Sequence, residues 1–225
     1  LAGHKATITI VHHLAPLNLL VTASLDCTLR FWDVNNDYRF RHAWSAEHKG
    51  TPLIINTVQH VVALEGEVHG AMQETVLLFL GTATGEIYLM NAQGDITKWR
   101  IHGEMDGLTK DKRGELVDES HNDSVLCLCP IPSLGSDGFL VSAGFDKEVK
   151  VWDLSEHSFS RNLVGHSKGV SSIKYSYDHD ILMTSGYDHD VLVWHPNIET
   201  CIAKLSGHAC SIAGSFFSRY APEII

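Results

Sequence analysis

The chain has 225 residues, of which 44% are apolar and 20% charged, enough for one large or two small folded domains rather than a disordered chain. With 17 Lys and Arg against 27 Asp and Glu, its formal net charge is −10, which disfavours nucleic-acid binding. It has no run of 18 uncharged apolar residues, so we expect no membrane insertion. Five cysteines, an odd number, make no disulfide framework, and residues 1–5 show no signal-peptide pattern, so we expect a cytoplasmic, reducing compartment.

Short strands separated by turn formers open the chain. Residues 6–11 (ATITIV), 18–22 (NLLVT) and 28–32 (TLRFW) are rich in β-branched and aromatic side chains, a composition typical of strands. No segment sustains a helical period. These observations predict an all-β protein.

An internal repeat organises the rest of the chain. Residues 22–33 (TASLDCTLRFWD), 142–153 (SAGFDKEVKVWD) and 184–195 (TSGYDHDVLVWH) align without a gap. In each copy an Asp stands six residues before a Trp, a hydroxyl residue stands four before the Asp, and a His lies 22 to 25 residues before the Asp. The three sets are His4, Thr22, Asp26 and Trp32; His121, Ser142, Asp146 and Trp152; and His166, Thr184, Asp188 and Trp194.

One copy between the first and the second of these is degenerate. Residues 80–91 (LGTATGEIYLMN) place Thr84 at the Asp position and Met90 at the Trp position. His48 is the candidate to open this copy, and it lies 36 residues before Thr84. The longer interval predicts an enlarged loop within 64–74.

The repeat resembles that of the WD-repeat β-propellers, in which four strands span about 40–45 residues between a Gly-His and a Trp-Asp. The resemblance implies blades at about 1–43, 44–119 (degenerate, with insertions), 120–164 and 165–206, and an incomplete blade at 207–225 with an inner strand near 210–217. Rings of this family commonly have seven blades, so we expect an internal part of a longer chain, or a ring that a partner or second copy completes. Residues 187–195 and 205–208 also resemble units of large axonemal WD-repeat proteins of cilia and flagella.

The resemblance implies that each set of four forms a hydrogen-bonded tetrad within its blade. A Trp N–H, an imidazole and a carboxylate near a packed sheet need partners, because each costs about 1–3 kcal/mol when left unpaired. The same His, Ser or Thr, and Asp recur three times at fixed spacing, which is expected of a structural element, whereas catalysis needs one site. We therefore expect no enzyme.

A serine hydrolase is the alternative from another class. Residues 165–169 (GHSKG) match G-x-S-x-G, the nucleophile elbow, with Ser167 as nucleophile. An elbow needs a strand before the serine and a helix after it, but 170–175 (VSSIKY) predicts a strand.

No metal or cofactor site is predicted. The twin YDHD strings at 177–180 and 187–190 fall at opposite ends of one strand, more than about 20 Å apart, so they cannot share a metal. Cys127 and Cys129 lack the further ligands that zinc needs. The chain also has no glycine-rich loop of the kind that holds phosphates.

These exclusions leave a non-enzymatic protein–protein interaction scaffold that binds proteins or peptides within a multiprotein assembly. Leu25, Phe145 and Tyr187 each precede a tetrad Asp at a turn, where small polar residues are usual, so they predict a recognition surface; packing against the neighbouring blade is the alternative. Residues 103–119, nine of 17 charged, predict a solvated loop without a strand, or a docking tether. An architectural role in a cilium or the cytoskeleton is a further alternative.

Overall fold

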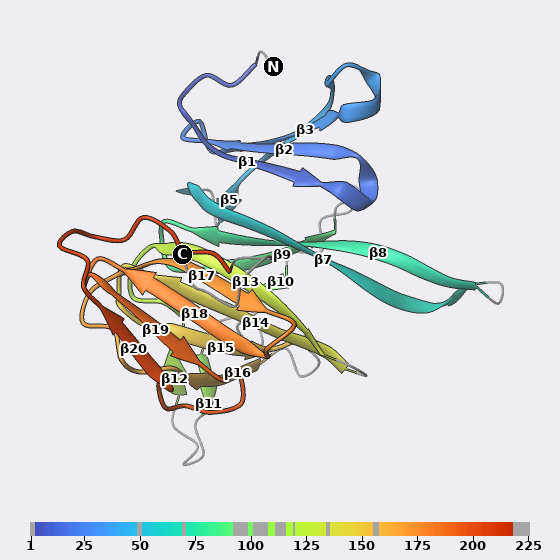
Figure 1. Cartoon of the computed structure of the whole chain (residues 1–225). Helices are drawn as coiled ribbons and strands as arrows, with labels where there is room; N and C mark the ends of the chain where they lie inside the picture. Colours follow the sequence, from blue (N-terminus) through green and yellow to red (C-terminus); the bar gives the residue numbers. More distant parts are fainter. Residues whose placement is uncertain are drawn as a thin grey trace.

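The computed structural model describes residues 3–48, 51–68, 71–91, 99–100, 108–110, 116–118, 120–133, 136–154 and 158–217. They form four four-stranded antiparallel sheets and two two-stranded ribbons (Figure 1). The predicted all-β class is confirmed. The helices among these residues are single 3₁₀ turns, and none of them is long enough to cross a membrane.

Each sheet is a meander of four consecutive strands. The first comprises β1 (Ile8–Leu14), β2 (Leu19–Ser24), β3 (Thr28–Asp33) and β4 (Arg39–Ser45), with 3₁₀ turns at Ala15–Leu17 and Val34–Asn36. The second comprises β7 (Ile55–Val68), β8 (Ala71–Thr82), β9 (Ile87–Asn91) and β10 (Trp99–Arg100). The third comprises β13 (Val125–Ser133), β14 (Ser136–Gly144), β15 (Val149–Asp153) and β16 (Ser158–Asn162), and the fourth β17 (Val170–Ser176), β18 (Ile181–Gly186), β19 (Asp190–Trp194) and β20 (Ala203–Ser206). The ribbons pair β5 (Glu47–His48) with β6 (Thr51–Pro52) and β11 (Leu108–Lys110) with β12 (Leu116–Asp118).

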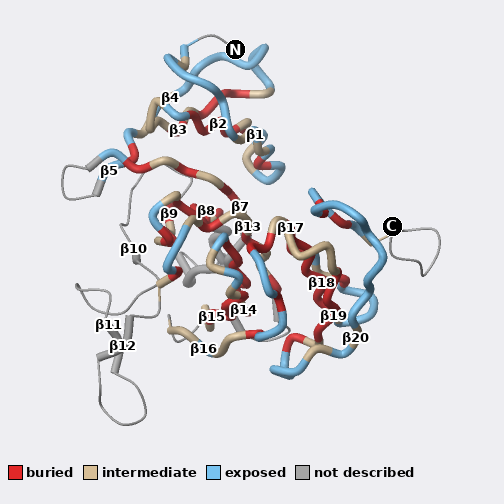
Figure 2. Tube along the Cα trace, turned by 90° about the vertical axis from the view of Figure 1, so that its left-hand side faces the viewer, coloured by how far each residue is buried: buried red, intermediate tan, exposed pale blue. Residues whose placement is uncertain are grey.

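The sheets pack face to face in chain order, and their first strands lie next to one another. β1 contacts β7, β7 contacts β13, and β13 contacts β17. Apolar side chains of successive sheets fill the space between them, with Phe31 in the first cluster, Trp152 in the second and Trp194 in the third. Figure 2 shows the buried residues concentrated on these strands. Burial of these faces supplies the main stabilisation of the stack.

Side-chain bridges of one kind tie the first sheet to the second, the third to the fourth, and the fourth to the segment that follows it. In each case one side chain near the start of the inner strand reaches a carbonyl oxygen of its own sheet and one of the following segment: Thr9 with Ala23 and Ile55, Cys127 with Ala143 and Val170, and Ser171 with Ser185 and Ile212. Ile212 therefore occupies the place that Ile55 and Val170 hold at the starts of β7 and β17.

The enlarged loop predicted within 64–74 is wrong. β7 and β8 stay paired through this segment, with Leu64 opposite Glu74 and Val68 opposite Ala71. The insertion thus lengthens a hairpin that extends beyond the first sheet in Figure 1. Cross-strand hydrogen bonds satisfy the backbone there, which an open loop would leave to water.

Two other local predictions need correction. Within 103–119, predicted as a loop without a strand, β11 and β12 form a short antiparallel pair, because even charged segments can satisfy their backbones in this way; other parts of this segment lie outside the described residues. The strand predicted near 210–217 is absent, apart from an isolated bridge at Phe217. A strand needs a continuous ladder of backbone hydrogen bonds, and the described part of this segment contacts the fourth sheet, with the Ile212 N–H donating to the carbonyl of Gly186, without forming such a ladder.

Candidate functional site

The structure brings the four residues of each predicted set together. In the third sheet, Nδ1 of His121 lies 2.8 Å from Oδ2 of Asp146, and its Nε2 lies 2.7 Å from Oγ of Ser142. The indole N–H of Trp152 donates to the same Oγ at 2.7 Å. The corresponding distances are 3.1, 2.8 and 2.9 Å among His4, Asp26, Thr22 and Trp32, and 2.8, 2.7 and 2.8 Å among His166, Asp188, Thr184 and Trp194.

Each set is a one-directional chain of hydrogen bonds. The carboxylate can only accept, so Nδ1 of the histidine carries the proton that it donates to the Asp. Nε2 then accepts from the hydroxyl, whose oxygen accepts from the indole. The chain joins the loop before the inner strand, the second strand, the turn after it and the end of the third strand, so it fixes four segments of one sheet.

The second sheet replaces the tetrad with apolar packing. Leu80 stands at the hydroxyl position and Met90 at the Trp position, and both are buried in the cluster between the first and second sheets. No polar group of the tetrad type is left there to satisfy. The degenerate copy therefore keeps its sheet without the hydrogen-bonded chain.

Burial and hydrogen bonding act in opposite directions on the pKa of the tetrad carboxylates, and the hydrogen bonds and charges together outweigh the burial. Burial alone would raise the pKa of Asp146, but the hydrogen bond and charge of His121 and the N–H groups of Glu148 and Asn122 outweigh it and hold the pKa below its usual range. The pKa of Asp188 is lowered in the same way, against burial, by the N–H of Ser167 and by His166. The folded state therefore prefers these groups ionised.

The Asp146 carboxylate is expected to contribute stability that acid removes. Because its folded pKa lies below the unfolded value of about 3.9, the contribution is complete above that pH and is lost as pH falls toward the folded pKa. In urea denaturation, Asp146→Asn should be less stable than the wild type by a constant amount between about pH 6 and 5, and this difference should shrink below about pH 4. A difference that is the same at pH 3 as at pH 6 would contradict the assignment.

The hydrogen bonds from Ser142 to His121 and from His121 to Asp146 connect the same residue types as a hydrolase triad, but the hydroxyl is inaccessible. Ser142 is fully buried and its oxygen already accepts the indole N–H of Trp152. Ser167 is exposed, but it lies in a turn that leads into β17, a strand, so the strand-turn-helix context of a nucleophile elbow is absent. The residues of the G-x-S-x-G match instead hold the tetrad, since the N–H of Ser167 donates to Asp188.

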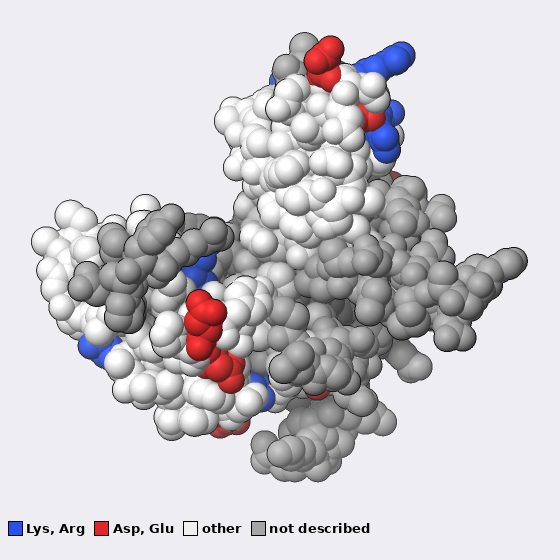
Figure 3. Space-filling view, turned by 45° about the vertical axis from the view of Figure 1, so that its right-hand side comes forward, with Lys and Arg blue, Asp and Glu red and all other residues white. Residues whose placement is uncertain are grey.

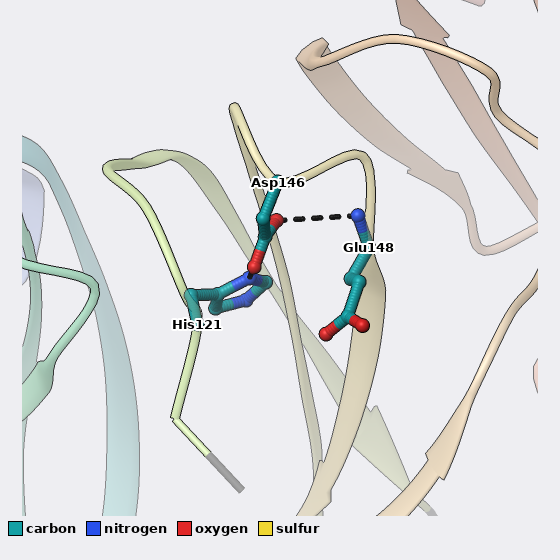
Figure 4. A group of neighbouring side chains, drawn as sticks. All are labelled: His121, Asp146 and Glu148. Carbon is teal, nitrogen blue, oxygen red and sulfur yellow. Dashed lines mark hydrogen bonds and ion pairs between the residues drawn. The ribbon is translucent and has the colours of Figure 1, made fainter.

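One group of three residues of metal-ligand type lies close together in the described part of the chain: His121, Asp146 and Glu148 (Figure 4). Both ring nitrogens of His121 are engaged in the tetrad, and Asp146 also accepts the N–H of Glu148. The Glu148 carboxylate lies 2.7 Å from the ammonium of Lys150. A metal would have to displace all of these partners, so the arrangement favours the tetrad over a metal centre.

Leu25, Phe145 and Tyr187 lie at equivalent turns, where the N–H of each donates to a carbonyl just before the inner strand. Leu25 and Phe145 are 47% and 48% exposed, and Tyr187 is half-buried. Phe145 and Tyr187, from adjacent sheets, stack with ring centroids 5.4 Å apart and planes at 19°; we call them the aromatic pair. The equivalent residue of the intervening second sheet is the small Ala83, so no large side chain joins Leu25 to the pair.

Gly169 is a part of this surface that the sequence prediction missed. A Cβ there would lie 3.0 Å from Phe145 and 3.2 Å from Tyr187, closer than most Cβ contacts, so glycine lets the aromatic pair close over this position without displacement. The sequence alignment could have identified it, because Gly169 aligns with Thr7 and Ser124 immediately before the inner strand and is the glycine among the three. A cavity of about 310 Å³ opens beside the pair, lined by Leu126, Ser171, Tyr187, Ser211, Ile212 and Ala213.

Four-stranded meanders stacked by their first strands, three of them holding the same polar tetrad, define the WD-repeat class of β-propeller. A family model described as "WD domain, G-beta repeat" matches residues 1–33, 114–153 and 157–195, and the chain belongs to the WD-repeat family.

Three relatives illustrate the range of similarity. The chain is 25% identical over 232 residues to "Nuclear distribution protein PAC1" of Arthroderma benhamiae, covering 98% of the chain and 44% of that protein. It is 28% identical over 129 residues to "Cilia- and flagella-associated protein 337 B" of Tetrahymena thermophila, covering 57% and 10%. It is 30% identical over 83 residues to "Cross-pathway control WD-repeat protein 2" of Flammulina velutipes, covering 37% and 26%. The chain thus spans less than half the length of each of these three relatives.

Proposed function

We propose that the chain is a non-enzymatic interaction scaffold that binds a protein partner through the aromatic pair, Phe145 and Tyr187. WD repeats generally serve protein–protein interaction, which supports the scaffold role. The observation that carries the proposed site is the stacking of two aromatic rings, Phe145 exposed and Tyr187 half-buried, at turn tips of adjacent sheets. Solvent-exposed aromatic clusters of this kind are typical of binding hot spots.

The charges beside the pair favour an acidic partner. Lys147 lies in the same turn as Phe145, and Lys168 precedes Gly169. Both lysines are exposed, and neither forms an ion pair with another described residue. The chain as a whole is acidic, which would favour a basic partner, and Asp146 and Asp188 directly follow the two rings. Both carboxylates are buried and paired with histidines, which leaves the two lysines as exposed, unpaired charges beside the pair. We propose a peptide segment that places an apolar side chain against the rings and carboxylates near the lysines.

The face shown in Figure 3 has few charged residues among those described. On the face in Figure 3, uncharged residues cover most of the described surface, and no extended basic patch is visible. Nucleic acid is therefore not the proposed partner. Leu25 is proposed as a separate, weaker contact, since Ala83 stands between it and the pair in the repeat order.

Removing the aromatic pair should abolish partner binding without unfolding the chain. We expect Phe145→Ser combined with Tyr187→Ser to reduce capture of specific partners at least tenfold in a quantitative affinity pull-down, because hot-spot aromatic residues commonly contribute about 2 kcal/mol or more each. Charge reversal by Lys147→Glu and Lys168→Glu should reduce capture of the same partners.

The matched control replaces two exposed apolar residues elsewhere in the third and fourth repeats, Val164 and Tyr177, with serine; they are 81% and 67% exposed. This control should retain every partner. If the aromatic-pair variant melts like the wild type and still captures the same partners, the proposed site is wrong.

An architectural role in a cilium or the cytoskeleton is the second candidate, and the similarity to the Tetrahymena cilia- and flagella-associated protein favours it. Such a component would stay with the detergent-insoluble cytoskeleton on fractionation, whereas a cytoplasmic adaptor would be extracted.

A further inference from the structure

Two histidines face each other across the junction between the first and second sheets. His12 lies on β1 and His60 on β7, the inner strands that pack together there. Nε2 of His12 is 2.8 Å from Nδ1 of His60, with ring centroids 5.0 Å apart and planes at 66°. Neither residue belongs to a tetrad or to the partner site proposed above.

The fold does not require histidine at these positions. His12 pairs with Val21, five residues before the tetrad Asp, and the residues with the same pairing in the third and fourth sheets are Cys129 and Lys174. The fold therefore accepts a thiol or an ammonium group at the position of His12. The histidine pair is particular to the junction of the first two sheets and is open to a role of its own.

We propose that His12 and His60 bind a divalent transition-metal ion, with Zn²⁺ the ion to test. At 2.8 Å the two nitrogens share one proton, so both point toward a common position between the rings. Neutral imidazole nitrogen is a preferred ligand of zinc, copper and nickel. Desolvation of the half-buried rings lowers the pKa of both histidines, His12 to about 4, which keeps them in the neutral, ligating form.

The geometry needs only a small adjustment to accept the ion. Two nitrogens bound to tetrahedral zinc at about 2.0–2.1 Å lie about 3.3 Å apart, so the rings would separate by about 0.5 Å. The proton between them would move to the second nitrogen of the ring that carries it, and no net proton would be released. The described residues supply two ligands, fewer than the three or four of a structural or catalytic zinc site, so the proposed site is a weaker, open one in which water fills the remaining coordination positions beside the half-buried rings.

His13 provides a matched control one residue away. Along β1 the burial alternates, so that His12 and Leu14 are partly or fully buried while Val11 and His13 are exposed. Successive side chains of a strand point to opposite faces, so His13 lies on the exposed face of β1; it is near enough to His60 to lower its pKa, but the hydrogen bond to His60 is made by His12. It has the same ligand chemistry as His12 without the His60 partner.

Titration of the full chain with Zn²⁺ by isothermal calorimetry tests the proposal. We expect one equivalent to bind, with the dissociation constant raised at least tenfold by His12→Asn and by His60→Asn and unchanged by His13→Asn. Equal affinity in all four proteins, or loss of affinity in His13→Asn alone, would overturn the assignment. Melting curves in the presence of EDTA establish that each variant is folded.

A second measurement needs no variant and decides the question if a substitution prevents folding. In imidazole ¹H–¹⁵N spectra of the wild type, Zn²⁺ should shift the Nε2 resonance of His12 and the Nδ1 resonance of His60, an unlike pair of ligand atoms that random surface binding would not select. Shifts confined to other histidines, or no shifts at one equivalent of Zn²⁺, would show that the pair is only a hydrogen bond.

Discussion

Asp146→Ala is expected to lower the melting temperature of the chain by about 6–12 °C. The substitution removes the acceptor of the buried His121 Nδ1–H and of the N–H groups of Asn122 and Glu148. Leaving the imidazole unpaired and releasing the loop costs about 3 kcal/mol, and each kcal/mol corresponds to about 2–4 °C in a chain of this size. Thermal unfolding followed by tryptophan fluorescence measures the effect.

Asp178→Ala is the matched control for this substitution. Asp178 is exposed in the turn between β17 and β18, and no hydrogen bond or ion pair joins it to another described residue. Its loss should change the melting temperature by less than about 2 °C, as is usual for surface substitutions. If Asp146→Ala melts with the wild type within error, the tetrad does not hold the third sheet.

Trp194→Ala should destabilise the chain most strongly, by about 3–5 kcal/mol, the range for truncating a large buried aromatic side chain. Trp194 is fully buried between the third and fourth sheets, where it packs with Leu192 and Leu163. Its indole N–H also donates to Thr184 at the end of the tetrad. The free energy of unfolding in urea gives the loss directly.

Two further variants separate packing from hydrogen bonding at this position. Trp194→Phe keeps most of the ring volume and removes the indole donor, so it should cost about 1–2 kcal/mol. Trp44→Ala makes the same truncation at a half-buried Trp on the outer strand β4 and should cost less than half as much as Trp194→Ala. Equal losses at Trp44 and Trp194 would contradict the assigned core.

The repeat made the tetrads predictable from the sequence. Three ungapped copies placed Asp146, Ser142 and Trp152 at constant intervals, and constant intervals on a two-stranded hairpin give constant geometry. The degenerate copy was predictable for the same reason, because Leu80 and Met90 replace the polar members with apolar ones that the core accepts.

Features that depend on neighbouring sheets could not be predicted in this way. The repeat shows that Phe145 and Tyr187 occupy equivalent turns, but their stacking depends on how closely two sheets approach over Gly169. The contact of His12 with His60 likewise arises from the side-by-side packing of two inner strands. The length of the 64–74 insertion was visible, whereas its pairing was not, because loop length alone does not determine cross-strand register.

The most direct test of the account compares partner capture by two folded variants, well below the melting temperature of both. One is the aromatic-pair variant, Phe145→Ser with Tyr187→Ser, and the other is the tetrad variant Asp146→Asn. If the tetrads are structural and the tips bind, the first loses its partners at an unchanged melting temperature, and the second keeps them at a lowered one. If the tetrad variant loses its partners while the aromatic-pair variant keeps them, the functional site lies at His121 and Asp146 and the account is wrong.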